Sequence, residues 1–594
     1  MKLKIFNNQY SDIILKPYLR TSLSIAANTM TAQFGSIVIA ALVGYYLGSV
    51  ELAAFGLLIP LVNLFNLSNR MLKNGLQNSA SHACGKGNIE LAISHLNTVL
   101  AVIIIIALID ILAIFFCAEP ISEAMGFRGE NFWLVGHAKD FLLGFMPCVF
   151  FTKLNDILGV CLYIEGNNRL AVASSAVAAI TTCALALASV FVFKTGLFGI
   201  GLAMSGAALA GLMVTSLHFL TGRSRMKLSP RSINWRLVKE DAYIGLSTLS
   251  RELTKIIRDY AANMVLLTAG GYTTVAIYAA LQSMGNLVWI PCSGLSSAFS
   301  IISAIAYGER DKKLLERIIT LWWHIGGGLY LLLMPIFAFF ADDLTGIYTR
   351  NPDLFEQTYM AALVYTVQFI PGFFTNMWLY YTATERVNFS IVFNFFRSGL
   401  TIVAILFMWF ITGGTEGLFW LYFTVVESGG SLAIAAAIWH DTGRFPRKIT
   451  DFLYLKKDYE KPIRKQYRYE VENMEDAVAV SELSQDIMEM SGMDEKLAYR
   501  VGLFLEELCT HEVQHTFKEN ISKADIRVVV YEGEIFIRVR DNGELINPME
   551  WAKMQTDEDE GRFNNISFVL SLATEMKYVS VIGLNNLIVR LKTA

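Results

Sequence analysis

Charged residues are scarce in this chain. Asp, Glu, Lys and Arg account for 17% of its 594 residues, and hydrophobic residues account for 54%. A soluble globular protein carries about 25% charged residues, and the mean hydropathy here is +0.44. These figures exclude an ordinary soluble protein, a disordered chain and a collagen-like chain.

Cysteine is also sparse. The seven cysteines are odd in number, scattered, and never spaced as Cys-x-x-Cys. Most of them lie in or beside apolar stretches, where cysteine behaves as a small hydrophobic residue. We therefore expect neither a disulfide framework nor a metal site among Cys84, Cys117, Cys148, Cys161, Cys183, Cys292 and Cys509.

The few charges are unevenly distributed. Residues 441–594 hold 49 of the 101 charged residues, of which 21 are basic and 28 are acidic. The first 440 residues hold 28 basic and 24 acidic residues. The chain therefore joins a sparsely charged, slightly basic body to a charged, net acidic tail.

The body contains apolar stretches long enough to cross a bilayer, for which about 20 residues suffice. Twelve such stretches lie near 21–47, 52–80, 91–118, 133–163, 169–193, 196–221, 243–269, 274–305, 318–341, 357–382, 388–412 and 416–440. We predict twelve transmembrane helices in two six-helix lobes, 21–222 and 243–440, joined by a basic linker, 223–242. The preceding segment, 1–20, is polar and has no signal-peptide core.

Lys and Arg are biased toward one side of the predicted membrane. With the N-terminus inside, seventeen Lys and Arg lie in the inside segments and three lie in the outside loops. By the positive-inside rule, both termini and hence the tail are cytoplasmic. We expect a multi-pass protein of a bacterial cell (inner or plasma) membrane.

The two predicted lobes repeat one sequence pattern. An offset of 223 residues aligns them without a gap over about forty residues. The matched pairs include Gly48 with Gly271, Asn63 with Asn286 and Gly85 with Gly308. Six spans in each half give the halves the same topology, related by an axis along the membrane normal, as in transporters that bind substrate between their halves.

Several loose motifs follow one another in the first half of the body, and similar motifs appear in the same order in the second half. Those of the first half lie at 43–48, 52–56, 85–88, 165–169 and 199–203, with Gly75 between the second and third. On these segments the body, roughly 15–440, resembles the multidrug and toxic compound extrusion (MATE) family. The resemblance implies antiport, in which an organic solute leaves as sodium or protons enter and two six-helix lobes rock.

The predicted seventh span, 243–269, carries five charges on one face. At 100° per residue they fall within an arc of about 120°, and they are Arg251, Glu252, Lys255, Arg258 and Asp259. Glu252 and Lys255, and Lys255 and Asp259, have the spacing of ion pairs. Either these side chains snorkel to the membrane interface, or they face a water-filled cavity in which a carboxylate exchanges a proton or sodium for substrate.

The first span, 21–47, departs from the MATE pattern. Several subgroups carry an acidic residue there, but this chain offers only polar side chains such as Asn28 and Gln33. We take these two residues, with Asn63 and Asn286, as transport candidates and leave the coupling ion open between H⁺ and Na⁺. The net +1 charge on the face of the seventh span admits an anionic or zwitterionic substrate, against the cationic drugs typical of the family.

Further charges lie within other predicted spans. Lys153 and Asp156 are three residues apart in 133–163 and can form an ion pair, for which we favour a structural role over one in transport. Arg397 in 388–412 is a weaker candidate for lining a cavity.

The tail divides into a linker and a domain. Residues 441–465 are basic, contain two prolines and can meet anionic lipid. From 466 the pattern predicts strands at 466–472, 524–541 (a hairpin), 577–582 and 585–592, and helices at 474–491, 494–517 and 564–575. We predict an α/β sandwich over 466–594, large enough for its own core.

The order of these elements resembles the GHKL (Bergerat-fold) ATP-binding domain of anti-sigma-factor serine kinases. Glu507 matches the catalytic base, and His511 stands where the family has a magnesium-binding Asn. Asp541 and Gly543 match the adenine-binding motif, and Asn565 occupies a position that is usually glycine. The resemblance implies an ATP and Mg²⁺ site, and the lost motif residues imply weak or absent kinase activity.

These observations predict a secondary active efflux antiporter of organic solutes or drugs, with a degenerate kinase-like regulatory domain. The transporter half is not an enzyme, and kinase activity of the tail stays open. The alternative is a membrane sensor in which the transporter-like half detects a ligand and the tail is a kinase or partner-binding switch. Expected partners are the bilayer, a small organic solute and a cytoplasmic regulatory protein, but not nucleic acid, since the tail is net acidic.

Overall fold

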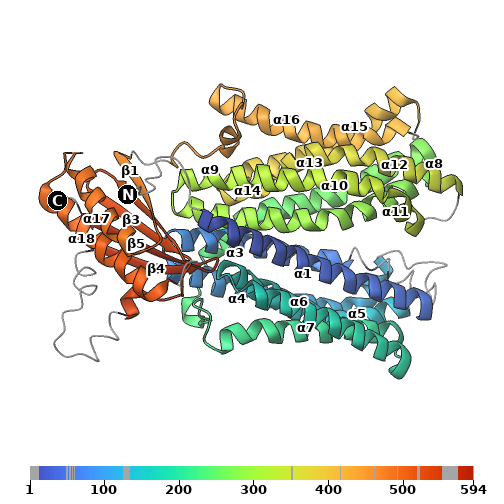
Figure 1. The fold of residues 1–594 in the computed structure, drawn as a ribbon. Helices are drawn as coiled ribbons and strands as arrows, with labels where there is room; N and C mark the ends of the chain where they lie inside the picture. Colours follow the sequence, from blue (N-terminus) through green and yellow to red (C-terminus); the bar gives the residue numbers. More distant parts are fainter. Residues whose placement is uncertain are drawn as a thin grey trace.

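The chain folds into two bundles of helices and a smaller C-terminal domain at one end of them (Figure 1). This computed structural model describes residues 12–47, 61–124, 134–348, 352–414, 417–459, 463–490, 492–517, 522–551 and 573–592, with the single positions 51, 55 and 58. We name the bundles the N-lobe (12–220) and the C-lobe (237–442), and call the end beside the C-terminal domain (465–592) the domain-side end.

The N-lobe is built from long helices. Its described helices are α1 (Leu15–Leu42), α3 (Leu67–Gly85), α4 (Ile89–Ala124), α5 (Leu134–Ile164), α6 (Asn168–Ala188) and α7 (Gly196–Leu220). Two of them run on into short π-helical segments, η2 (Val43–Leu47) after α1 and η4 (Ser189–Phe193) after α6. Each of these segments overlaps a range that the apolar pattern predicted.

The C-lobe is more broken. Its helices are α8 (Leu237–Gly308), α9 (Lys312–Leu321), α10 (Gly327–Phe339), α11 (Ala341–Tyr348), α12 (Pro352–Tyr365), α13 (Phe369–Thr375), α14 (Trp378–Ala383), α15 (Val387–Thr412) and α16 (Tyr422–Thr442). The long α8 covers two predicted spans and is interrupted at Gly271, whose φ of 73° and ψ of −164° are not helical. Glycine tolerates this conformation because it has no Cβ.

The predicted number of twelve crossing helices is not confirmed. Within the described part of the chain, eight helical segments are long and apolar enough to cross a membrane. The predicted spans 21–47, 52–80, 243–269 and 357–382 are not among them. The span 243–269 carries the five clustered charges, which lower its hydropathy. The span 357–382 is divided among the shorter helices α12, α13 and α14. Length and hydropathy alone therefore do not identify these two spans.

The lobes meet through pairs of close contacts that obey the 223-residue offset. A Cβ at Gly85 would overlap the carbonyl oxygen of Ile305, and a Cβ at Gly308 would overlap that of His82. Residues 82 and 85 map onto 305 and 308, so the two contacts exchange under the offset. Gly245 against Met71 and Gly294 against Ser22 form a second pair of this kind, which supports the inferred duplication.

Equivalent loops close the two lobes at the domain-side end. Asn88 accepts a hydrogen bond from the backbone N–H of Leu91 at 3.0 Å, and Asp311 accepts one from Leu314 at 3.0 Å. These residues are again 223 apart, and each side chain begins the helix that follows it. The loops 85–88 and 308–311 are therefore one structural element in two copies.

The C-terminal domain contains an antiparallel five-stranded sheet of order β1-β2-β3-β5-β4. The strands are β1 (Lys465–Val471), β2 (Ala524–Val530), β3 (Glu534–Asp541), β4 (Glu575–Val581) and β5 (Leu584–Lys592). The helices α17 (Met474–Glu489) and α18 (Glu495–His511) pack on one face through residues such as Val501, Phe504 and Ile526. The predicted GHKL sandwich is not confirmed; the described residues show this small sheet with helices on one face, and most of the predicted helix 564–575 lies outside them.

Candidate functional site

A cationic cavity lies within the C-lobe. It has a volume of about 310 Å³, and its charged lining residues are Arg251, Lys255, Arg258, Arg397 and Glu427. Three cations come from one face of α8, as the helical spacing predicted, and the other two charged residues come from α15 and α16. Four cations thus face one carboxylate.

Not all of this positive charge is neutralised locally. Arg258 is paired with Asp259 at 2.8 Å. Arg397 is ion-paired with Glu427, whose other carboxylate oxygen accepts a 2.6 Å hydrogen bond from the Thr375 hydroxyl. Lys255 has an exposed side chain and no ion pair with any residue that the structure describes.

The predicted ion pairs within α8 are wrong. Glu252 turns away from Lys255 and pairs with Arg70 of α3 at 2.9 Å. Its second, longer contact is with Arg251 at 3.7 Å. The sequence spacing permitted both pairs, but Arg70 from the opposite lobe supplies a closer partner, so Glu252 links the lobes.

A second cavity, in the N-lobe, is nearly neutral. It has a volume of about 320 Å³, and its charged lining residues are Lys73 and Asp156, which pair at 2.6 Å. The predicted pair of Lys153 with Asp156 is therefore wrong, because Lys153 is buried and paired with Asp110 of α4. The two lobes thus enclose cavities of different charge.

The polar candidates from the first half of the sequence separate in the structure. Asn28 lines the N-lobe cavity and donates a hydrogen bond to the Tyr163 hydroxyl at 2.9 Å. Gln33 and Asn63 are exposed and line neither of the two cavities. The side chain of Asn286 lies outside the described residues.

Sequence analysis missed two residues of these cavities. Glu427 and Lys73 are ionisable residues within or beside apolar helices. A scan for every charge inside a predicted span would have found both, since such residues are costly and mark functional sites by default.

The described part of the C-terminal domain does not present a fitting site for magnesium and ATP. His511 is buried, its ring lies 4.6 Å from that of Trp551 and 4.9 Å from that of His515, and neither ring nitrogen has a hydrogen-bond partner among the described residues. Burial and the neighbouring His515 lower the pKa of His511 to about 4. A neutral imidazole in an aromatic box is a poor ligand for Mg²⁺, which prefers oxygen.

The carboxylate of Asp541 is already hydrogen-bonded to neighbouring residues of the domain. One oxygen accepts hydrogen bonds from the Gly543 N–H and the Asn585 amide, both at 2.8 Å. Burial raises the pKa of this carboxyl to about 6, and it shares a hydrogen bond with Glu512. Gly543 lies against the Thr516 carbonyl, which a Cβ would overlap, so this glycine serves packing within the domain.

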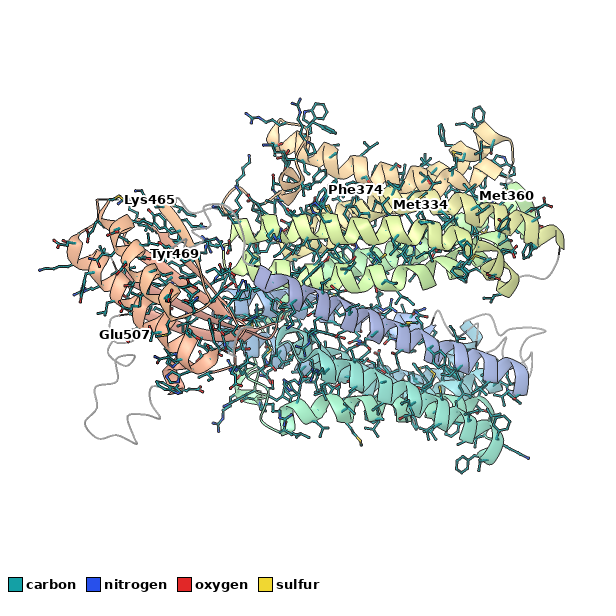
Figure 2. All side chains as sticks on the ribbon, viewed as in Figure 1. Met334, Met360, Phe374, Lys465, Tyr469 and Glu507 are labelled. Carbon is teal, nitrogen blue, oxygen red and sulfur yellow. The ribbon has the colours of Figure 1, made fainter. Side chains whose placement is uncertain are left out.

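Of the remaining predicted nucleotide residues, Glu507 lies on α18, one helical turn before His511. Figure 2 shows Glu507 on α18, on the side of the sheet away from the two lobes. Asn565 lies outside the described residues. The GHKL resemblance accordingly stays a prediction.

Comparison with known proteins identifies the family of the membrane body. The family model described as MatE matches residues 24–188 and 258–407, together more than half of the chain. A solved MATE structure in complex with MaL6 is 18% identical, with a TM-score of 0.66, over 74% of this chain and 96% of its own. The same values hold for a MOP superfamily transporter from Pyrococcus furiosus Vc1 (DSM3638) and for a multidrug resistance MATE family transporter in an outward-facing conformation.

The two kinds of match carry different weight. The structural likenesses at this identity show the fold, which is that of a helical MATE-type membrane transporter, whereas the family model shows the family. No curated protein matches the chain. On the family model, the predicted MATE resemblance is confirmed, and the chain belongs to the MatE family.

Proposed function

We propose that this protein is a secondary active transporter that exports a small organic solute bearing an anionic group. The observation that carries the proposal is the C-lobe cavity, in which four cations face one carboxylate. In a protein cavity, where the effective dielectric constant is lower than in water, an ammonium without an ion-pair partner attracts an anion more strongly than it does in water. Lys255 supplies that ammonium, and Arg251 adds a second cation that is only loosely paired.

In this proposal, transport results from movement of the two lobes relative to each other. Their close contacts involve α1, α3 and α8 at the domain-side end, so alternating access requires these contacts to separate. The bias of Lys and Arg toward one side favours a cytoplasmic position for this end. The coupling ion is H⁺ or Na⁺, and the carboxylates nearest the cationic cavity, Asp259 and Glu427, are its candidate carriers.

Nucleotide chemistry does not enter the proposed function. The aromatic surroundings of His511 and the occupied carboxylate of Asp541 do not fit Mg²⁺ or adenine. The C-terminal domain acts instead as the regulatory part of the transporter.

The experiment that tests this proposal is flux into or out of proteoliposomes containing the full chain. Carboxyfluorescein serves as the anionic probe and ethidium as the cationic probe, each under an imposed proton or sodium gradient. We expect one gradient to drive carboxyfluorescein faster than ethidium, with protein-free liposomes as the baseline. Movement of ethidium alone would overturn the anionic class, and no movement of either probe would favour the sensor alternative.

A further inference from the structure

The face of the C-terminal sheet opposite helices α17 and α18 carries a row of arginines. Arg468, Arg527 and Arg538 lie directly opposite one another on β1, β2 and β3. Like charges opposite one another across strands destabilise a sheet, and these side chains are at most 6% exposed. Such a face needs acidic partners from outside the sheet.

The C-lobe loop 308–311 supplies these partners. Glu309 accepts a 2.9 Å hydrogen bond from Arg538, and it also pairs with Arg540. Asp311 accepts a 2.9 Å hydrogen bond from Arg538 and pairs with Arg468 at 2.5 Å. Both carboxylates are fully buried.

Electrostatics fix the charge state of this contact. Burial alone would raise the pKa of the Asp311 carboxyl, but the guanidiniums of Arg468, Arg527 and Arg538 hold it well below its usual range. The carboxylate therefore stays ionised at all physiological pH values, and the domain is tied to the C-lobe by permanently charged groups.

The opposite edge of the same sheet rests on the N-lobe. The turn between β4 and β5 places Ile582 against the loop that follows α5, where the Ile582 N–H donates a hydrogen bond to the carbonyl of Ile164 at 2.6 Å. A Cβ at Gly166 would overlap the backbone of Gly583. Ile582 is 7% exposed and belongs to the hydrophobic cluster of the lobes.

The conformation of Ile582 indicates that this tip is built for the lobe. Its φ is 51° and that of Gly583 is 76°, the pattern of a two-residue hairpin turn that normally prefers Asn-Gly. A β-branched residue with positive φ is a strained outlier. The strain persists at the position where an apolar side chain reaches the N-lobe.

We propose that the C-terminal domain is a clamp that holds the domain-side end of the two lobes together. One continuous sheet contacts the C-lobe through β1–β3 and the N-lobe through the β4–β5 turn. It therefore bridges the end at which Gly85 and Gly308 bring the lobes into contact. Opening this end requires the sheet to release one lobe.

The N-lobe contact is the one that releases. Release of the C-lobe contact would break several charge-assisted hydrogen bonds at once, those of Arg468, Arg538 and Arg540 to Glu309 and Asp311, and such bonds are stronger than neutral ones. The described part of the N-lobe contact is mainly apolar; Arg225 stacks 4.7 Å over the Tyr578 ring, and the aliphatic stem of Lys577 lies beside Gly87. The clamp thus stays on the C-lobe and opens at the β4–β5 turn.

The test measures the distance between the lobes rather than flux, so its failure is distinct from failure of the transport proposal. Spin labels on cysteines at Thr221 and His440, both exposed at the domain-side end, report the separation in the full chain. Cys117 and Cys183, the two cysteines that are not buried, are replaced by alanine. Pulsed electron paramagnetic resonance gives the populations of short and long distances.

Ile582→Asn is the decisive variant. Asn suits the turn better than Ile, so the domain folds at least as well while the apolar contact with the N-lobe is lost. We expect the ratio of long to short distances to rise roughly tenfold, the scale of losing one buried Ile side chain. Ile582→Leu, which keeps an apolar tip, leaves the ratio near the wild-type value.

Gly166→Ala tests the same contact from the lobe. Its Cβ forces the turn away, and the expected shift matches that of Ile582→Asn. Gly196→Ala is the control, because Gly196 has a φ of 58° but nothing within 4 Å of the added Cβ, so it reproduces the backbone strain alone. An unchanged distance distribution in both Ile582→Asn and Gly166→Ala overturns the clamp.

Discussion

Arg538 on β3 and Glu309 of the C-lobe loop form a fully buried ion pair at 2.9 Å, although 229 residues separate them. The sheet and the loop are therefore stabilised together. Removing one partner of a buried pair leaves the other charge without compensation, which costs about 3–5 kcal/mol.

Glu309→Gln is accordingly expected to destabilise the docked domain by about 3 kcal/mol or more, because Arg538 and Arg540 both lose a carboxylate. Thermal unfolding of the full chain in detergent measures the loss. Glu532→Gln serves as the control: its pair with Arg464 is exposed at 85% and 65%, and an exposed pair contributes at most about 1 kcal/mol. Equal effects of the two variants would show that the buried cluster does not stabilise docking.

The contacts between the lobes make a symmetric prediction. Gly85→Ala and Gly308→Ala each place a Cβ into a backbone carbonyl of the other lobe. Because the two positions are equivalent under the 223-residue offset, both variants are expected to separate the domain-side end to a similar extent. Gly159→Ala in α5 meets nothing within 4 Å and is the matched helical control. Distances between labels on the two lobes measure the effect, and a large response to only one variant would contradict the equivalence.

Much of this architecture could be predicted from the sequence, because apolar length and helical period are local properties. The period placed Arg251, Lys255 and Arg258 on one face, and they do line one cavity. The ion pair of Glu252 escaped prediction because its partner, Arg70, belongs to the other lobe. Long-range pairing of this kind leaves no mark in the spacing along one helix.

The contact between the C-terminal sheet and the C-lobe could not be predicted from the sequence for a related reason. In β2 and β3, Arg527 and Arg538 alternate with apolar residues, a pattern that indicates a strand with one face in solvent. The structure buries both faces instead, since Glu309 and Asp311 cover the arginines. Alternation separates the two faces of a strand, but it does not distinguish water from an acidic loop more than 200 residues away in the sequence.

The carboxyl pair in the C-terminal domain predicts a pH dependence. Burial raises the pKa of Asp541 from 3.8 to about 6, and it also raises the pKa of its neighbour Glu512. A group whose folded pKa is raised stabilises the fold below its unfolded pKa, and this contribution is lost as pH rises through the folded pKa. The domain is therefore expected to lose about 1–3 kcal/mol between pH 4 and pH 7.

Asp541→Asn isolates this contribution. The Asn oxygen can still accept hydrogen bonds from Gly543 and Asn585, and its amide can donate to Glu512, so the variant is expected to be more stable than wild type at pH 8 and to lack the advantage at pH 4. Thermal unfolding of both proteins at matched pH values gives the difference between them, which cancels the titrating groups that do not interact with Asp541. A difference that does not change with pH would exclude the shared proton.

The charge of the C-lobe cavity predicts opposite effects for two neutral substitutions. Lys255 has no ion pair among the described residues, so Lys255→Gln removes a cation without leaving a buried charge alone, and binding of carboxyfluorescein is expected to weaken about tenfold, or about 1.4 kcal/mol. Glu427 is the one carboxylate of the lining, and Glu427→Gln is expected to tighten anion binding because Arg397 loses its counter-charge. Equilibrium binding to the full chain in detergent separates both effects from coupling. Lys139→Gln, at an exposed pair with Glu119 outside the cavity, controls for the general loss of a positive charge. Removing a negative charge favours an anion held by these cations, so weaker anion binding in Glu427→Gln would contradict an anion site.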